Sequence, residues 1–106
     1  MTSQTDLIVL IIRDFEENRR QFHTITGHSW RRRPSAEIAA IADGLNECLT
    51  FTRSGMEKPT SAAEYEMVEG MVDELEHMYY QAMNAWMRKT RIEYQLMLRI
   101  REIQHV

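Results

Sequence analysis

Apolar residues recur at helical spacing along the last part of the chain, from Ser61 to Val106. They fall on one line of positions seven residues apart and on the two lines beside it, which is the face that a helix packs against other helices. These apolar positions are Val68, Met71, Val72, Leu75, Met78, Tyr79, Ala82, Ala85, Trp86, Ile92, Leu96, Ile100 and Ile103. The pattern predicts one long amphipathic helix over about residues 62–104.

The predicted long helix has a clear start and one weak point. Ser61 and Glu64 have the spacing of a capping box, in which the serine hydroxyl accepts a hydrogen bond from the glutamate backbone N–H. Lys89 interrupts the main apolar line, which leaves open a kink at Arg88–Arg91. Between residues 80 and 98 the apolar face widens onto two adjoining lines, which add Tyr80, Met83, Met87, Tyr94 and Met97.

Two shorter helices are predicted before the long one. The first covers about residues 6–24 with Thr5 as its N-cap, and Leu7, Val9 and Leu10 make its first turns apolar all round. These turns are therefore either deeply buried or in contact with a partner. The alternative is a short β-strand at residues 7–12, which are rich in branched side chains, but the chain offers no second strand to pair with it.

The second short helix covers about residues 36–53, with Ser35 as its N-cap and Gly55 just past its end. Its inward-facing positions are Ile38, Ile41, Ala42, Leu45, Cys48, Leu49 and Thr52. In the preceding loop Trp30 is followed by three arginines. We expect Trp30 to cap the core and the arginines to face the acidic start of the long helix. A base-stacking and phosphate-binding role for Trp30–Arg33 is the alternative.

A chain of 106 residues is long enough for one domain. We predict a single all-α domain over residues 1–106, in which two short helices pack on one long C-terminal helix. That long helix would extend roughly 65 Å if straight, whereas each short helix would extend only about 30 Å. Part of the long helix would then stay uncovered, which predicts a homodimer that pairs two long helices antiparallel.

The formal net charge of -3 hides a division along the chain. Counting Lys and Arg against Asp and Glu, residues 1–36 carry +2, residues 37–77 carry -8 and residues 78–106 carry +3. An antiparallel pair would place the acidic 64–76 stretch of one long helix near the basic 88–101 stretch of the other. The chain is not basic enough for non-specific nucleic-acid binding, so nucleic acid is not an expected partner.

Candidate chemical groups are few. Cys48 lies on the inward face of its helix, which favours a small core residue over a nucleophile, and a single cysteine suits a reducing cytoplasm. Glu74 and His77 have the spacing of di-iron carboxylate bundles, but no second such pair exists and both lie on the polar face. The other histidines, at positions 23, 28 and 105, lack zinc-type spacing. We therefore expect no catalytic activity, no metal and no cofactor.

The N-terminal apolar run Leu7–Ile12 is six residues long, far short of the about 20 that a membrane-spanning helix needs. Asp6 precedes the run, where a secretory signal would carry positive charge. These features predict a soluble, cytoplasmic protein with no membrane partner.

We expect the protein to bind other proteins through apolar side chains that are left over once its own core is built. Methionine-rich apolar surface adapts to partners of different shapes. The predicted partner-binding residues are Leu7, Val9, Leu10, Tyr80, Met83, Met87, Tyr94 and Met97. The predicted dimer-interface residues are Tyr79, Trp86 and Ile100.

Two short helices followed by a long methionine-rich helix, in a chain of this length without recognisable chemistry, resemble the small helical quorum-sensing antiactivators of bacteria (QslA-like). The resemblance concerns the whole-chain layout and carries no site residues onto this sequence. It implies a homodimeric cytoplasmic protein that binds a LuxR-type transcription factor and blocks its dimerisation or DNA binding. Two other functions fit the residues: a phage-type inhibitor or assembly adaptor, and a small DNA-binding regulator that uses Trp30–Arg33.

Overall fold

The computed structural model describes residues 4–26, 29–57 and 61–104. These residues form helix α1 (Gln4–His23), a short 3-10 helix η1 (Ser29–Arg32), helix α2 (Ser35–Met56) and helix α3 (Ala62–Gln104), and none of them lies in a strand. The prediction of an all-helical chain is confirmed, and the alternative of a strand at residues 7–12 is wrong because these residues lie inside α1.

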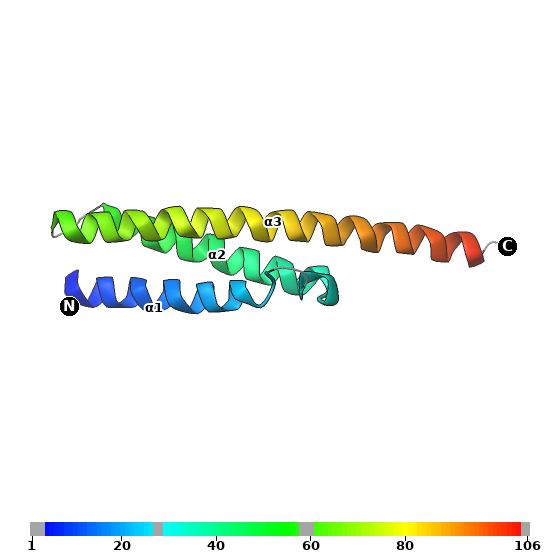
Figure 1. The fold of residues 1–106 in the computed structure, drawn as a ribbon, viewed down its shortest axis with the longest axis horizontal. Helices are drawn as coiled ribbons and strands as arrows, with labels where there is room; N and C mark the ends of the chain where they lie inside the picture. Colours follow the sequence, from blue (N-terminus) through cyan, green and yellow to red (C-terminus); the bar gives the residue numbers. More distant parts are fainter. Residues whose placement is uncertain (1–3, 27–28, 58–60, 105–106) are drawn as a thin grey trace.

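Helices α1 and α2 run antiparallel to each other and lie side by side along the first part of α3 (Figure 1). Helix α3 then continues alone, well beyond the end of this bundle. The molecule measures 67 × 26 × 18 Å and has a radius of gyration of 18.3 Å. A compact domain of this length has a radius of gyration near 13 Å, so the excess reflects the long α3.

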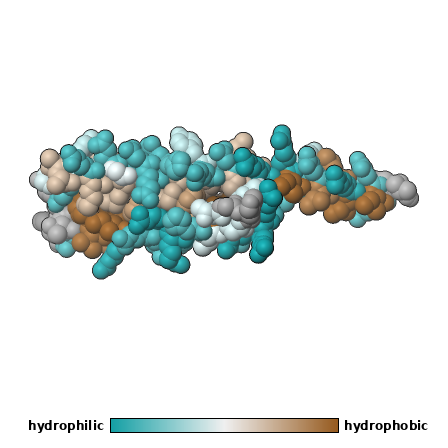
Figure 2. Space-filling model, in the orientation of Figure 1, coloured by the Kyte–Doolittle hydropathy of each residue, from teal (hydrophilic) through white to brown (hydrophobic). Residues whose placement is uncertain are grey.

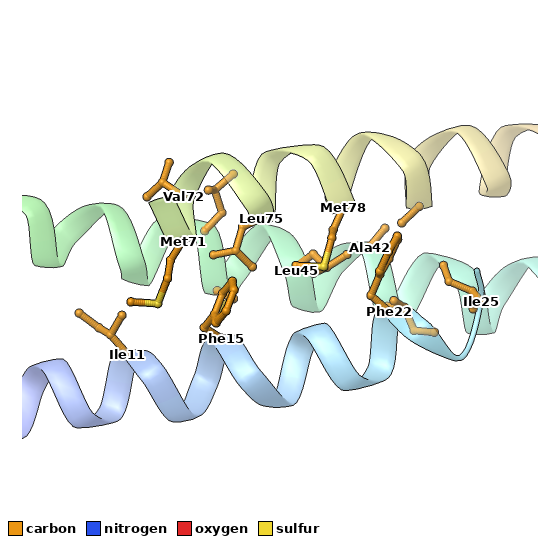
Figure 3. Close-up of a cluster of buried hydrophobic side chains, with 14 of the residues drawn as sticks. Ile11, Phe15, Phe22, Ile25, Ala42, Leu45, Met71, Val72, Leu75 and Met78 are labelled. Atoms are coloured by element: carbon orange, nitrogen blue, oxygen red, sulfur yellow. The ribbon is translucent and has the colours of Figure 1, made fainter. Parts of the chain in front are cut away.

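One hydrophobic core joins the three helices. Ile11 and Phe15 on α1 point toward Met71 and Leu75 on α3, and side chains of α2 close the space between them (Figure 3). The buried apolar residues are Ile8, Ile11, Phe15, Phe22, Ile25, Trp30, Ile38, Ile41, Ala42, Leu45, Cys48, Leu49, Val68, Met71, Val72, Leu75, Met78 and Ala82. Burial on α3 therefore stops at Ala82, although the apolar pattern of the helix continues for about 20 further residues.

Helices α1 and α2 approach closely at two glycines of α2. A Cβ atom built on Gly55 would overlap with Cδ1 of Ile11, and one built on Gly44 would lie 3.0 Å from Oδ1 of Asn18. Gly55 was predicted just past the end of the helix, but it is buried inside α2, which ends at Met56. Its missing side chain makes room for α1.

Two exposed ion pairs join α3 to the shorter helices. Arg19 of α1 pairs with Glu74 at 3.4 Å, and Arg53 of α2 pairs with Glu76. Such exposed pairs typically contribute less than about 1 kcal/mol each. The buried apolar residues therefore determine which face of α3 meets the other two helices.

The helix boundaries differ from the sequence prediction at two N-caps. Helix α1 begins at Gln4, so Thr5 lies inside it, and helix α2 begins at Ser35, with Pro34 at its N-cap and no side-chain cap from that residue. The capping box of α3 is present in its first half, because the Ser61 hydroxyl accepts a hydrogen bond from the Glu64 N–H at 3.1 Å. Helix α3 runs unbroken through Arg88–Arg91.

Candidate interaction surface

The end of the bundle is joined to α3 by two charged side chains. Lys89 Nζ donates a hydrogen bond to the backbone carbonyl of Arg31 at 2.7 Å, which holds η1 against α3. One turn further on, the Glu93 carboxylate accepts hydrogen bonds from Ser35, at the start of α2. Lys89 interrupts the apolar line of α3 because it lies where the bundle ends and polar backbone must be satisfied.

Glu93 acts as the N-cap that α2 lacks locally. Its Oε1 accepts from the backbone N–H of Ser35 at 3.0 Å, and its Oε2 accepts from the Ser35 hydroxyl at 2.6 Å. The hydrogen bonds from Ser35, followed by the positive charge of Lys89, lower the pKa of the Glu93 carboxyl. A carboxylate at a helix start also meets the positive end of the helix dipole.

Beyond Glu93, α3 has no cover from its own chain. Every described residue from 94 to 104 is exposed, and we call this segment the overhang. Figure 2 shows apolar atoms gathered on the overhang, past the end of the bundle. The exposed apolar side chains on or beside it are Met87, Ile92, Tyr94, Leu96, Met97, Leu98, Ile100 and Ile103.

These apolar side chains lie on two opposite faces of α3. Leu96 and Ile103 continue the line of Ala82, because seven residues make about two turns of a helix. With Ile92 and Ile100 they form what we call the inner face, which points in the direction that the buried residues of α3 point within the bundle. Unlike those buried residues, the inner face has no helix of its own chain packed over it.

The opposite face carries a second pattern, which we call the outer stripe. Its six positions are seven residues apart and all are exposed: Glu66, Asp73, Tyr80, Met87, Tyr94 and Arg101. Each lies two residues before a position of the core line, by which we mean the seven-residue series Val68, Leu75, Ala82, Lys89, Leu96 and Ile103. Two residues correspond to about 200° of rotation. The outer stripe therefore faces away from α1 and α2 along the whole of α3.

The residues predicted to bind a partner fall into two groups. Val9, Leu10, Tyr80, Met87, Tyr94 and Met97 are exposed, and so is Ile100 of the predicted dimer interface. The others are partly buried and packed against the core of their own chain: Leu7, Tyr79, Met83 and Trp86. Met83 and Trp86 are therefore only partly exposed, and with Ala39 and Ala42 of α2 they line a hollow of about 150 Å³.

The Trp30–Arg33 loop lies at the opposite end of the bundle from the place predicted for it. Trp30 is buried in the core, as predicted. Its neighbouring arginines do not reach the acidic start of α3, because η1 packs on α3 near Lys89. Arg33 instead pairs with Glu37 of α2. Arg31 thus adds to a basic surface near Lys89, and the acidic start of α3 receives no arginine from this loop.

This basic surface borders the inner face. A hollow of about 460 Å³ is lined by Trp30, Arg31, Arg88, Lys89, Arg91 and Ile92. Arg31 also lies over the Trp30 ring, 5.6 Å from its centroid. The inner face therefore begins, at Ile92, beside a group of positive side chains.

The other candidate groups have structural partners. Burial, with a further contribution from nearby Asp14, raises the pKa of the Cys48 thiol to about 12. Glu74 and His77 are both exposed, and Glu74 pairs with Arg19 while the His77 ring contacts Gln81. Within residues 4–26, 29–57 and 61–104, no three His, Cys, Asp or Glu side chains gather as a metal site requires. His28 and His105 lie outside these residues.

The contacts that Lys89 and Glu93 make with the bundle could not be predicted from the sequence pattern. Lys89 looked like a defect in the apolar line and Glu93 like an ordinary surface acid, since their partners lie 58 residues earlier in the chain. The inner face did have a signal in the sequence. Its residues continue the core line over a length that two short helices cannot cover.

No helix in the described part of the chain is both long and apolar enough to cross a bilayer. Comparison with protein-family models, with curated proteins and with solved structures found no match for the chain. The resemblance to quorum-sensing antiactivators stays a prediction.

Proposed function

We propose that the chain is a non-enzymatic regulatory binding protein of the cytoplasm, active as a homodimer, whose overhang takes up a helix of another protein. One observation carries this proposal. The inner face continues the core line of α3 for three turns past the bundle, and none of its four aliphatic side chains is covered: Ile92, Leu96, Ile100 and Ile103.

The inner face matches the way one helix recognises another. Apolar residues spaced three, four and seven apart fit the groove or face of a partner helix with the same spacing. Interface energy concentrates in a few well-packed anchors, each costing about 2 kcal/mol or more when lost. Leu96 and Ile103 are the natural anchors, because they lie on the core line itself and Ile103 is 75% exposed.

Charge indicates the kind of helix that would bind. Arg31, Arg88 and Arg91 border the start of the inner face, and Arg99 lies beside it on the overhang. A target helix with one apolar face and acidic residues on its flank would be complementary in both respects. Opposite charges at the rim mainly speed association, while the apolar contact supplies the affinity.

We propose a LuxR-type transcription factor as the target, and an antiactivator as the role of this chain. The whole-chain layout supports this choice of target. Occupying a helix that the transcription factor uses for its own dimerisation or for holding DNA would block transcription without any catalytic step.

The test is a promoter reporter in a heterologous host that co-expresses this chain with members of a panel of LuxR-type activators. We expect the chain to repress at least one activator and the double variant Leu96→Glu/Ile103→Glu to lose that repression. The matched control is Gln95→Glu/Gln104→Glu, which adds the same charge to polar positions of the overhang. No repression of any activator, or equal repression by both double variants, would contradict the proposal.

A second candidate function has an observation in its favour. The structure brings Arg31, Arg88 and Arg91 together around Trp30, which fits a DNA-binding regulator better than the loop alone did. Phosphate contacts make binding fall steeply with salt, whereas apolar helix contacts change little. A duplex that binds at 50 mM salt, releases at 300 mM salt and no longer binds Arg88→Ala/Arg91→Ala would favour this function.

A further inference from the structure

We propose that a second copy of this chain docks antiparallel along the outer stripe of α3, with the two-fold axis beside Met83 and Asn84. This rests on the homodimer of the proposed function and assigns its face, direction and register. The inner faces would then stay free for target helices, one at each end of the dimer.

The outer stripe is exposed even along the part of α3 that packs on α1 and α2. The lack of cover over the overhang therefore does not account for its exposure. Tyr80 is 65% exposed and Met87 is 58% exposed, yet both precede the overhang. They remain uncovered because α1 and α2 pack on the opposite face of α3. A large aromatic and a methionine, followed at the same spacing by Tyr94 at 58%, form an apolar centre without a partner in the chain.

The order of acidic, apolar and basic residues along the outer stripe favours a second copy of this chain, in the antiparallel direction, as the partner. It begins with two acids, Glu66 and Asp73, continues through the apolar centre and ends with Arg101. Such an order is self-complementary only when two copies run in opposite directions. A parallel pair would place Glu66 against Glu66 and Asp73 against Asp73, which costs energy.

The antiparallel register follows from matching the two ends. Placing Glu66 opposite the partner's Arg101 brings Asp73 opposite the partner's Tyr94 and Tyr80 opposite the partner's Met87. The aromatic and methionine side chains thus meet around the axis, and opposite charges lie at both ends.

One position without a side chain supports this register. A Cβ atom built on Gly70 would have no atom within 4 Å in its own chain. In the proposed pair, Gly70 lies on the same flank as the partner's Leu98, which is 38% exposed. A glycine there lets the leucine side chain lie close to the backbone of the other helix.

The stripe keeps one spacing over its whole length. Its apolar centre spans two seven-residue steps, from Tyr80 to Tyr94, and charged positions extend the line to Glu66 and Arg101. On a straight helix such a line drifts by about 20° per step, and a left-handed supercoil removes that drift. The partner approaches from the side opposite to α1 and α2, so the bundle does not obstruct it.

Chemical cross-linking of introduced cysteines tests the direction and register. The native Cys48 is buried, so a short bismaleimide reacts with the introduced residue. We expect Asn84→Cys to give cross-linked dimers, because both copies lie beside the axis. Glu66→Cys alone should give none, because the two copies are roughly 50 Å apart. A mixture of Glu66→Cys and Arg101→Cys should cross-link.

The possible outcomes separate this inference from the proposed function. Cross-linking of Glu66→Cys alone would show a parallel pair and overturn the register. A dimer by sedimentation equilibrium that gives no cross-link at Asn84→Cys would overturn the outer stripe while the homodimer stands. A 12.6 kDa species at micromolar concentration would overturn both the stripe and the homodimer.

A pair of glutamate variants tests the same face without cross-linking. Met87→Glu should convert the dimer to a helical monomer, because it places charge in the apolar centre of the contact. Ile103→Glu is the matched control on the inner face, and it should dimerise like the unmodified chain. Loss of the dimer in Ile103→Glu with retention in Met87→Glu would assign the interface to the inner face instead.

Charge reversal adds a quantitative check of the register. Glu66→Arg or Arg101→Glu alone should weaken dimerisation by about fivefold, since two rim pairs are lost in each dimer. The double variant carries both reversals and restores opposite charges, so its dimerisation should recover. Further weakening of the double variant would contradict the pairing of these two positions.

Discussion

The Glu93 carboxylate accepts two hydrogen bonds from Ser35, one from its backbone N–H at 3.0 Å and one from its hydroxyl at 2.6 Å. The start of α2 is thereby capped by a residue that lies 58 positions later in the chain. The contact also marks the last point at which α3 is joined to the bundle. Everything beyond it on α3 is surface.

We predict that Glu93→Gln lowers the thermal stability at pH 7. The hydrogen bonds from Ser35 lower the pKa of Glu93 below its ordinary value of 4.5. A lowered folded-state pKa means that the ionised carboxylate stabilises the fold above the unfolded-state value, and that this contribution disappears as the pH falls through the folded-state value. The difference in melting temperature between the original chain and Glu93→Gln should therefore shrink below pH 4.5.

The control for this pH dependence is Glu102→Gln, an exposed acid on the overhang. Glu102→Gln should have the same melting temperature as the original chain at pH 7 and at pH 3. A difference for Glu93→Gln that is as large at pH 3 as at pH 7 would mean that the ionised carboxylate is not what stabilises the start of α2.

The two glycines Gly55 and Gly70 should respond to alanine in opposite directions. In Gly55→Ala the new methyl group would meet the fully buried Ile11 side chain, so we expect a loss of about 1–2 kcal/mol from overpacking. In Gly70→Ala the methyl group enters space that is open within the single chain, so the monomer should gain about 1 kcal/mol from the higher helix propensity of alanine. Urea unfolding of both variants, at a protein concentration low enough to keep the chain monomeric, measures the two effects.

Lys89→Ala should loosen η1. It removes the hydrogen bond to the Arg31 carbonyl, which we expect to contribute about 0.5–1.5 kcal/mol. Arg88→Ala is the matched control, since Arg88 is the exposed neighbour of Lys89. Hydrogen exchange of the Arg33 amide, which bonds to the Trp30 carbonyl, should accelerate in Lys89→Ala and not in Arg88→Ala. Equal rates in the two variants would show that Lys89 does not hold the loop.

Cys48 should be unreactive in the folded chain. With its pKa raised to about 12, the thiol forms little thiolate at pH 8, and its side chain is also buried. Alkylation by iodoacetamide at pH 8 should be roughly a thousandfold slower than in the urea-unfolded chain, where the thiol has its ordinary pKa near 8.5. Similar rates in both states would mean that α1 and α2 separate readily in solution.

Periodicity along the chain was sufficient to predict the helical class, the limits of α3 and most of the core. The core line from Val68 to Ala82 is a local property, because the side of a helix that an apolar residue occupies depends only on its spacing from its neighbours. The Ser61 cap was predictable for the same reason, since donor and acceptor lie three residues apart. The sequence also led us to expect Trp30 to cap the core, and it is buried.

The rest depended on which segments meet in space. Lys89 and Glu93 are polar residues on an apolar helix until the chain places Arg31 and Ser35 beside them, and spacing cannot reveal a contact over 58 residues. Gly55 reads as a helix terminator unless Ile11 is known to lie against it. In the same way, the end of the bundle decided which apolar residues of α3 are core and which are surface. Trp86 and Leu96 belong to the same pattern, but only Trp86 lies within reach of the start of α2.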